Sequence, residues 1–153
     1  MSEHYKSLSA VYPIILKEEK GHQYVLLHQR MHTGYMDGYW DFAGSGHVDE
    51  NESAIEAVVR ECWEEIDIEV ERKDVAFVHL CHRIGKNGAR TYYDLYFVVS
   101  SFAGLPRIAE PDKCSDLQWF DITRLPDTMI IHRRDAFDHY LHHEVYSEIT
   151  YTY

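Results

Sequence analysis

The clearest pattern of hydrophobic and polar positions lies in Glu52–Ile66, where apolar side chains recur every three or four residues. This spacing places them on one face of an α-helix and leaves polar side chains on the other. The apolar face consists of Ile55, Val58, Val59, Cys62 and Ile66. Asn51 is the expected N-cap, because acidic residues follow it around the first turn. The pattern therefore predicts a packed amphipathic helix.

Short apolar runs on both sides of this helix predict strands. Those before it are Leu8–Leu16, Gln23–Arg30 and Tyr39–Ala43, with a polar turn at Glu18–Gly21 and a loop at His32–Gly38. Those after it are Val75–Arg83 and Tyr92–Ser100, joined through Gly85–Gly88, and then Leu117–Asp121. His132–Val145 is predicted as a C-terminal helix. The order of strands, helix, strands and helix indicates an α+β fold with a mixed sheet.

Length and composition narrow the class of protein. The 153 residues, 45% of them apolar, suit a single domain spanning 1–153, and no repeat or linker interrupts them. A formal net charge of -11 argues against binding to a nucleic acid polymer or to an anionic membrane. A small phosphate-bearing substrate remains compatible with this charge if a bound cation lies between substrate and protein.

The cysteines and the N-terminus indicate the compartment. The three cysteines form no C-x-x-C pair and are odd in number, which favours reduced thiols. The first nine residues are polar, unlike a signal peptide, and no apolar run approaches the roughly 18 residues that span a bilayer. We therefore expect a cytoplasmic protein without a membrane segment.

Three carboxylates share one face of the predicted helix. Glu61, Glu64 and Glu65 stand at positions i, i+3 and i+4, so they lie close together and repel one another. A bound divalent cation would offset this repulsion, and Mg²⁺ prefers carboxylate oxygens and accompanies phosphate substrates. The alternative is a solvated acidic helix face, which is the commoner explanation for such triplets in general.

The spacing around these carboxylates resembles the Nudix box, G-x5-E-x7-R-E-U-x-E-E-x-G-U, where U is bulky and apolar. Every polar position of the pattern matches: Gly46, Glu52, Arg60, Glu61, Glu64 and Glu65. One position departs, because Asp67 replaces the last glycine. That glycine lies just past the helix end, where a left-handed backbone is common, and Asp tolerates this conformation at a cost of about 1 kcal/mol.

The resemblance implies an α/β/α sandwich around a mixed sheet. It also implies Mg²⁺-dependent hydrolysis, with Mn²⁺ as an alternative ion, of a nucleoside diphosphate linked to another group. Glu61, Glu64 and Glu65 would ligate the metal, helped by the backbone carbonyl of Gly46. Arg60 would orient these carboxylates, and Glu52 would fix the geometry of loop and helix. The expected partner is a small nucleotide-like substrate such as a nucleoside triphosphate, and a homodimer is left open.

Other residues are candidates for contact with substrate. The segment Glu110–Cys114, followed by Leu117, Trp119 and Phe120, resembles a segment of nucleotide-directed Nudix relatives. Glu110 and Trp119 could thus line a substrate pocket, or they could belong to a turn and a core strand. Tyr92 and Asp94 share one face of a predicted strand with Arg90 and Tyr96, and one of them could reach the site.

Two other functions are compatible with the same fold. One is a catalytically silent nucleotide sensor, against which the intact acidic triplet weighs. The other is a diphosphate isomerase, because WDFAGSGHVD resembles the start of the box in the isopentenyl-diphosphate isomerase branch. That branch needs a catalytic cysteine, and none lies near an N-terminal loop. His139 and His143 would share a helix face but have no third ligand, so we expect no zinc site there.

Overall fold

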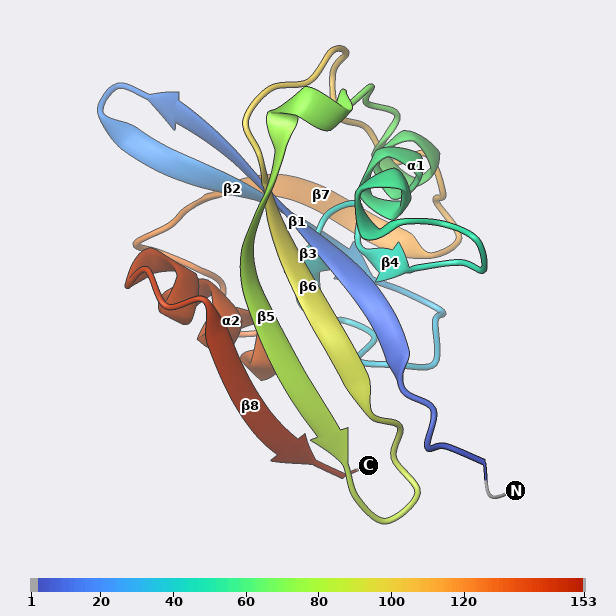
Figure 1. Cartoon of the computed structure of the whole chain (residues 1–153). Coiled ribbons are helices and arrows are strands. Elements are labelled where there is room, and N and C mark those ends of the chain that lie inside the picture. Colours follow the sequence, from blue (N-terminus) through green and yellow to red (C-terminus); the bar gives the residue numbers. More distant parts are fainter. Residues whose placement is uncertain (1–2, 153) are drawn as a thin grey trace.

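A computed structural model describes residues 3–152 and contains one mixed sheet (Figure 1). The strands follow the order β3-β2-β1-β6-β5-β8, with β4 beside β1 and β7 beside β2. Their bounds are β1 Leu8–Glu19, β2 His22–Arg30, β3 Trp40–Phe42, β4 Gly46–His47, β5 Val75–Gly85, β6 Tyr92–Val99, β7 Cys114–Asp121 and β8 Tyr146–Tyr151. The helices are α1 Ala54–Ile66 and α2 Ile131–Leu141, with a 3₁₀ turn η1 at Arg72–Asp74. The predicted α+β fold is confirmed.

Strand β1 explains how the layers form. Its residues from Ala10 to Ile15 are all buried, because helices cover both faces of the sheet. Side chains alternate along a strand, so Val11 and Ile15 pack in the core that contains α1. Tyr12 and Ile14 pack in the second core, with Phe137 of α2. The expected sandwich of a mixed sheet between helices is therefore confirmed.

The sheet combines parallel and antiparallel pairs. β1 pairs with β6 in parallel and with β2 in antiparallel orientation, and β5 pairs with β6 in antiparallel orientation. β2 pairs with β1 from Leu16 to Glu19, near the C-terminal end of β1, whereas β4 pairs with Ala10 and Val11 near its N-terminal end. The chain thus passes from β3, beside β2, to β4, beside the start of β1, and this passage brings Gly46 against Glu61 of α1, the box helix.

The predicted N-cap of the box helix was wrong. Ser53 is the N-cap: its hydroxyl accepts a hydrogen bond from the Glu56 amide at 3.1 Å, and the Glu56 carboxylate accepts one from the Ser53 amide at 3.1 Å. This reciprocal capping box gives a hydrogen-bond partner to the amides of Ser53 and Glu56, which would otherwise be free at the start of the helix. Asn51 instead has a left-handed backbone, with φ 64°, in the preceding turn.

The C-terminal helix was predicted too long. It ends at Leu141 rather than Val145, and the chain then turns at His143, with φ 60°, into strand β8. The prediction missed β8 altogether. β8 pairs in parallel with β5, a partner distant in sequence. Because α2 ends before His143, His139 and His143 do not share one helix face as expected. The predicted first turn was also too early, since Glu18 and Glu19 belong to β1. Neither helix within residues 3–152 is long and apolar enough to cross a membrane.

Candidate functional site

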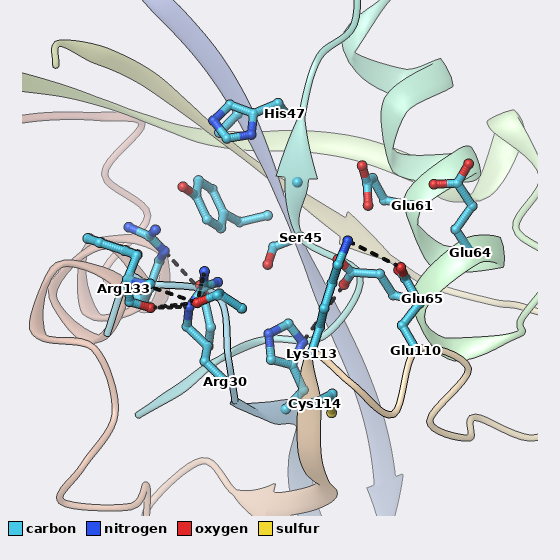
Figure 2. A pocket seen from close by; sticks show the side chains of 18 of the residues that line it. Arg30, Ser45, His47, Glu61, Glu64, Glu65, Glu110, Lys113, Cys114 and Arg133 are labelled. Atoms are coloured by element: carbon cyan, nitrogen blue, oxygen red, sulfur yellow. Dashed lines mark hydrogen bonds and ion pairs between the residues drawn. The ribbon is translucent and has the colours of Figure 1, made fainter. Parts of the chain in front are cut away.

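A cleft of about 770 Å³ lies beside the box helix. Figure 2 shows its two sides: Glu61, Glu64, Glu65 and Glu110 lie on one, and Arg30 and Arg133 lie on the other. Residues of every strand, of α1 and α2, and of the loop before β7 line the cleft. The box and the segments far from it in sequence therefore meet at one hollow.

Glu65 has the most unusual environment on the acidic side. Its side chain is 23% exposed, yet its Oε2 atom is buried and has no hydrogen-bond partner within residues 3–152. Burial, and then repulsion from Glu61, Glu110 and Asp41, raises the pKa of Glu65 well above its ordinary value. Burial likewise raises the pKa of Glu61. A cation at this point would remove both penalties.

His28 does not supply that cation. Its Nδ1 lies 3.9 Å from Glu65 Oε2, a distance at which a protonated imidazole would form an ion pair. Burial, however, lowers the pKa of His28 to about 4, so the ring is neutral at pH 7. His28 therefore does not compensate the negative charge of Glu65.

Arg60 connects the box residues to one another. Its guanidinium donates to both carboxylate oxygens of Glu52, at 2.6 and 2.9 Å, and to the carbonyl of His47 at 3.0 Å. It also donates to Glu61 at 2.7 Å and to Glu64 at 3.1 Å. The planar fork of Arg suits such multiple contacts. These contacts have the geometry that the predicted orienting role of Arg60 and the predicted structural role of Glu52 require.

Gly46 lies directly against the Glu61 side chain. A Cβ added at this position would lie 2.3 Å from the carboxyl carbon of Glu61. A larger residue here would therefore displace the Glu61 carboxylate from its present position.

The groups that could hold a metal are Glu61, Glu64, Glu65 and the Gly46 carbonyl. Within residues 3–152, no three His, Cys, Asp or Glu side chains are already gathered as a metal-binding group. The carboxylates repel one another, and Arg60 takes up Glu61 and Glu64 instead. The fit to a cation thus rests on the unpartnered Glu65 oxygen and on the hard oxygen character of the donors.

The other predicted residues fall in different places. Glu110 and Tyr92 line the cleft. Asp94 is buried beside it, where Arg83 donates to both of its carboxylate oxygens at 2.7 and 3.1 Å. Trp119 does not line the cleft; its ring packs against the α1 core and faces Lys17 Nζ at 4.6 Å. Asp67 adopts the expected left-handed backbone, with φ 57° and ψ 38°.

Sequence reasoning missed the basic side of the cleft. Arg133 Nε donates to Asp41 Oδ1 at 3.1 Å across 92 residues of sequence, and its guanidinium lies 4.0 Å from the centre of the Tyr12 ring. The signal that could have located Asp41 is a charged residue between Trp40 and Phe42 in an apolar strand. Arg133 carries no comparable signal, because arginines are ordinary on helix surfaces.

Comparison with known proteins identifies the family of the chain. The NUDIX domain family matches residues 7–140, so the chain belongs to the Nudix family. A MutT NUDIX hydrolase from Burkholderia pseudomallei has a similar structure, with a TM-score of 0.76, 25% identity, and coverage of 88% of this chain and 98% of that chain. No curated protein sequence matches the chain significantly.

Two further solved structures share the fold. The E. coli ORF135 protein has a TM-score of 0.64 and 28% identity, covering 87% of this chain and 89% of that chain. The NUDIX domain of Shewanella oneidensis NrtR, solved in complex with ADP ribose, has a TM-score of 0.69 and 16% identity, with 90% of both chains covered. The Nudix fold expected from the box is thereby confirmed, and the structural relatives include hydrolases of the MutT type.

Proposed function

We propose that this protein is a Mg²⁺-dependent hydrolase that cleaves a diphosphate bond in a small nucleotide-like substrate, such as a nucleoside triphosphate or a related nucleotide. One observation carries the proposal. The box helix presents to a cleft large enough for a nucleotide a buried carboxylate oxygen of Glu65 that has no hydrogen-bond partner among residues 3–152. An uncompensated charge of this kind is costly in a protein that binds nothing there.

In this proposal Glu61, Glu64 and Glu65, with the Gly46 carbonyl, hold the cation. Mg²⁺, when bound, supplies a Lewis acid that polarises phosphoryl oxygens and makes water a stronger nucleophile. Mn²⁺ suits the same oxygen donors. Arg60 keeps Glu61 and Glu64 on the cleft side of the helix through its bonds to Glu52 and the His47 carbonyl, and it does not need to touch the substrate.

Residues around the acidic face would position the phosphates. Lys113 lines the cleft beside Glu110, with 3.5 Å between Nζ and a carboxylate oxygen, and offers an exposed positive charge. Burial raises the pKa of Glu65 well above its ordinary value, so its carboxylate gains more from a bound cation than an exposed one would. The remaining length of the cleft, toward Arg133, would receive the rest of the nucleotide.

The properties of the cleft support hydrolysis over isomerisation. Cys114 is the cysteine that lines the cleft, and burial raises its pKa, which keeps the thiol protonated. Its Sγ is engaged with the Asp116 carbonyl at 3.1 Å. A reactive thiolate of the sort that a diphosphate isomerase needs is therefore not favoured at this position.

A phosphate-release screen tests the proposal. Nucleoside triphosphates, dinucleoside polyphosphates, nucleotide sugars and ADP-ribose are incubated with the protein and Mg²⁺, and the products are separated by chromatography. We expect at least one substrate to be cleaved at a diphosphate bond, and cleavage to stop in excess chelator. Binding without turnover would instead establish the nucleotide sensor, and full activity in excess chelator would contradict the metal mechanism.

A further inference from the structure

The basic side of the cleft contains two buried polar atoms that make no hydrogen bond within residues 3–152. Asp41 is 1% exposed and Arg133 is 2% exposed, and both residues line the cleft. Asp41 Oδ2 and Arg133 Nη1 have no hydrogen-bond partner within residues 3–152. Buried polar groups are nearly always bonded, so a pair of exceptions at one cleft indicates that something else bonds them.

The two residues are held rigidly, which fixes where these atoms lie. Asp41 Oδ1 accepts from Arg133 Nε at 3.1 Å and from the Phe42 amide at 2.8 Å. Each of the two atoms has an ion-pair partner that makes no hydrogen bond to it: Arg30 Nη1 lies 3.5 Å from Asp41 Oδ2, and Asp94 Oδ2 lies 3.8 Å from Arg133 Nη1. The pair thus presents one acceptor and one donor whose positions do not depend on a flexible side chain.

The chemistry of the pair selects a neutral ligand edge over an anion. An anion offers acceptors alone, so it would bond Arg133 Nη1 but leave Asp41 Oδ2 unpartnered and repelled. An edge that carries an N–H beside an acceptor atom satisfies both. Nucleobases present such edges. The Tyr12 ring, stacked on Tyr96 and covered by the Arg133 guanidinium at 4.0 Å, helps to fix the position of Arg133. Across the cleft lie the carboxylates assigned to the cation (Figure 2).

We infer that Asp41 and Arg133 bind the base of the substrate, with Asp41 Oδ2 accepting from a base N–H and Arg133 Nη1 donating to the adjacent acceptor. The inference rests on the proposed function, because it takes the substrate to be a nucleotide. It makes these two residues determinants of specificity, separate from the box that acts on the phosphates. A substrate that lacks a base leaves both atoms unpaired and is rejected.

The assignment is tested by comparing the hydrolysis of a substrate that carries a base with that of a substrate that lacks one. The best nucleoside triphosphate of the screen is compared with ribose 5-triphosphate, and kcat/KM is measured for both. The wild type is expected to prefer the nucleotide by about tenfold or more, since buried polar groups left unpaired discriminate strongly. Asp41→Asn and Arg133→Gln should each bring the ratio toward one by lowering kcat/KM for the nucleotide alone.

The matched control is Arg134→Gln on the same helix. Arg134 donates to the Pro126 carbonyl and lines a second groove, away from the cleft. The ratio should stay at the wild-type value in this variant. Because buried variants at Asp41 and Arg133 are able to lose their fold, a second measurement uses the wild type alone: saturation-transfer NMR with adenosine, guanosine, cytidine and uridine, and with ribose, in chelator.

The outcomes separate this inference from the proposed function. At least one nucleoside should bind in the NMR experiment while ribose does not, whether or not the protein hydrolyses anything. Equal hydrolysis of nucleotide and ribose 5-triphosphate by the wild type would overturn the inference and leave the hydrolase standing. An equal loss on both substrates in Arg133→Gln would show that the pair holds an anionic group, which also overturns it.

Discussion

At the scale of single residues, the carboxylates on the acidic side of the cleft differ in whether a neighbouring group compensates their charge. Glu61 is compensated by Arg60 at 2.7 Å, whereas Glu65 has neither a cation nor a hydrogen-bond donor at its buried oxygen among residues 3–152. His28 is close enough to help, but burial keeps it neutral. Among the three box carboxylates, Glu65 is therefore the one whose charge most depends on a ligand.

Glu65→Gln should separate chemistry from folding. The variant keeps the shape of the side chain but removes its charge, so turnover at saturating Mg²⁺ should fall by about a hundredfold or more. The thermal midpoint should stay equal or rise, because a buried charge without a partner is removed. Steady-state kinetics and thermal melting of the same preparations measure both effects.

Glu69→Gln provides the matched control, since Glu69 is an exposed carboxylate just beyond the helix. It should leave turnover and melting unchanged. Near-normal turnover in Glu65→Gln would contradict the catalytic assignment and favour the nucleotide sensor.

At the scale of elements, helix α1 is fixed at both ends by local bonds. The Ser53–Glu56 capping box closes its start, and Asp67 closes its end by donating its amide to the carbonyls of Cys62 and Trp63. Asp67 does so with a left-handed backbone, which costs less for Asp than for most residues with a side chain. Arg107 Nε compensates its carboxylate at 2.6 Å on the surface. The helix therefore holds the box carboxylates on a rigid support without the glycine that the family pattern has there.

Substitutions at Asp67 test whether its role is conformational. Asp67→Gly relieves the left-handed strain of about 1 kcal/mol but loses an exposed ion pair worth about 0–1 kcal/mol, so stability should change by less than about 1 kcal/mol. Asp67→Ala loses the pair and keeps the strain, so it should be the less stable variant. Chemical denaturation gives both values, and turnover should stay near wild type in both. A large loss of rate in Asp67→Gly with an intact fold would show that this carboxylate takes part in the reaction.

At the scale of the whole molecule, the C-terminal segment is joined to the sheet by a buried histidine. His79 of β5 is 0% exposed; its Nδ1 lies 2.7 Å from the Glu144 carbonyl and its Nε2 lies 2.8 Å from the Ser147 hydroxyl. The carbonyl accepts only, so Nδ1 carries the proton and Nε2 accepts from Ser147. The His139 ring of α2 stacks on it, with ring centres 5.5 Å apart. One neutral ring thus links α2, β5 and β8.

Acid should weaken this link. Burial, assisted by His139, lowers the pKa of His79 below its ordinary 6.5. The unfolded chain then binds the proton more readily, so the stabilisation is fully present above about pH 6.5 and is lost as the pH falls below it. We expect the contribution of His79 to the free energy of unfolding to decrease between pH 7.5 and pH 5.5.

His79→Asn isolates the contribution of this residue. Asn keeps a donor near the Nδ1 position but cannot be protonated, so the variant should be about 1 kcal/mol less stable at pH 7.5 and lose less stability on acidification. Denaturant unfolding at both pH values measures this, with the exposed His4→Asn as control. Other buried or half-buried histidines contribute as well, so the comparison is between slopes. Identical slopes in wild type and His79→Asn would refute the assignment.

The sequence by itself determined the box helix and the kind of chemistry it supports. Glu61, Glu64 and Glu65 share a face because helical geometry repeats every 3.6 residues, and this relation holds whatever the rest of the chain does. The long contiguous spacing from Gly46 to Glu65 indicated the family in the same local way. The alternation of apolar and polar positions likewise predicted most strands, since each needs only its own pattern.

Only the tertiary structure decided the basic side of the cleft and the C-terminal strand. Arg133 meets Asp41 across 92 residues, and β8 joins β5 through a parallel pairing that depends on distant backbone groups. Trp119 faces the core rather than the cleft because of the register of β7 against β2. Such relations come from chain topology and from the bonding needs of buried polar groups, and neither leaves a periodic signal in the sequence.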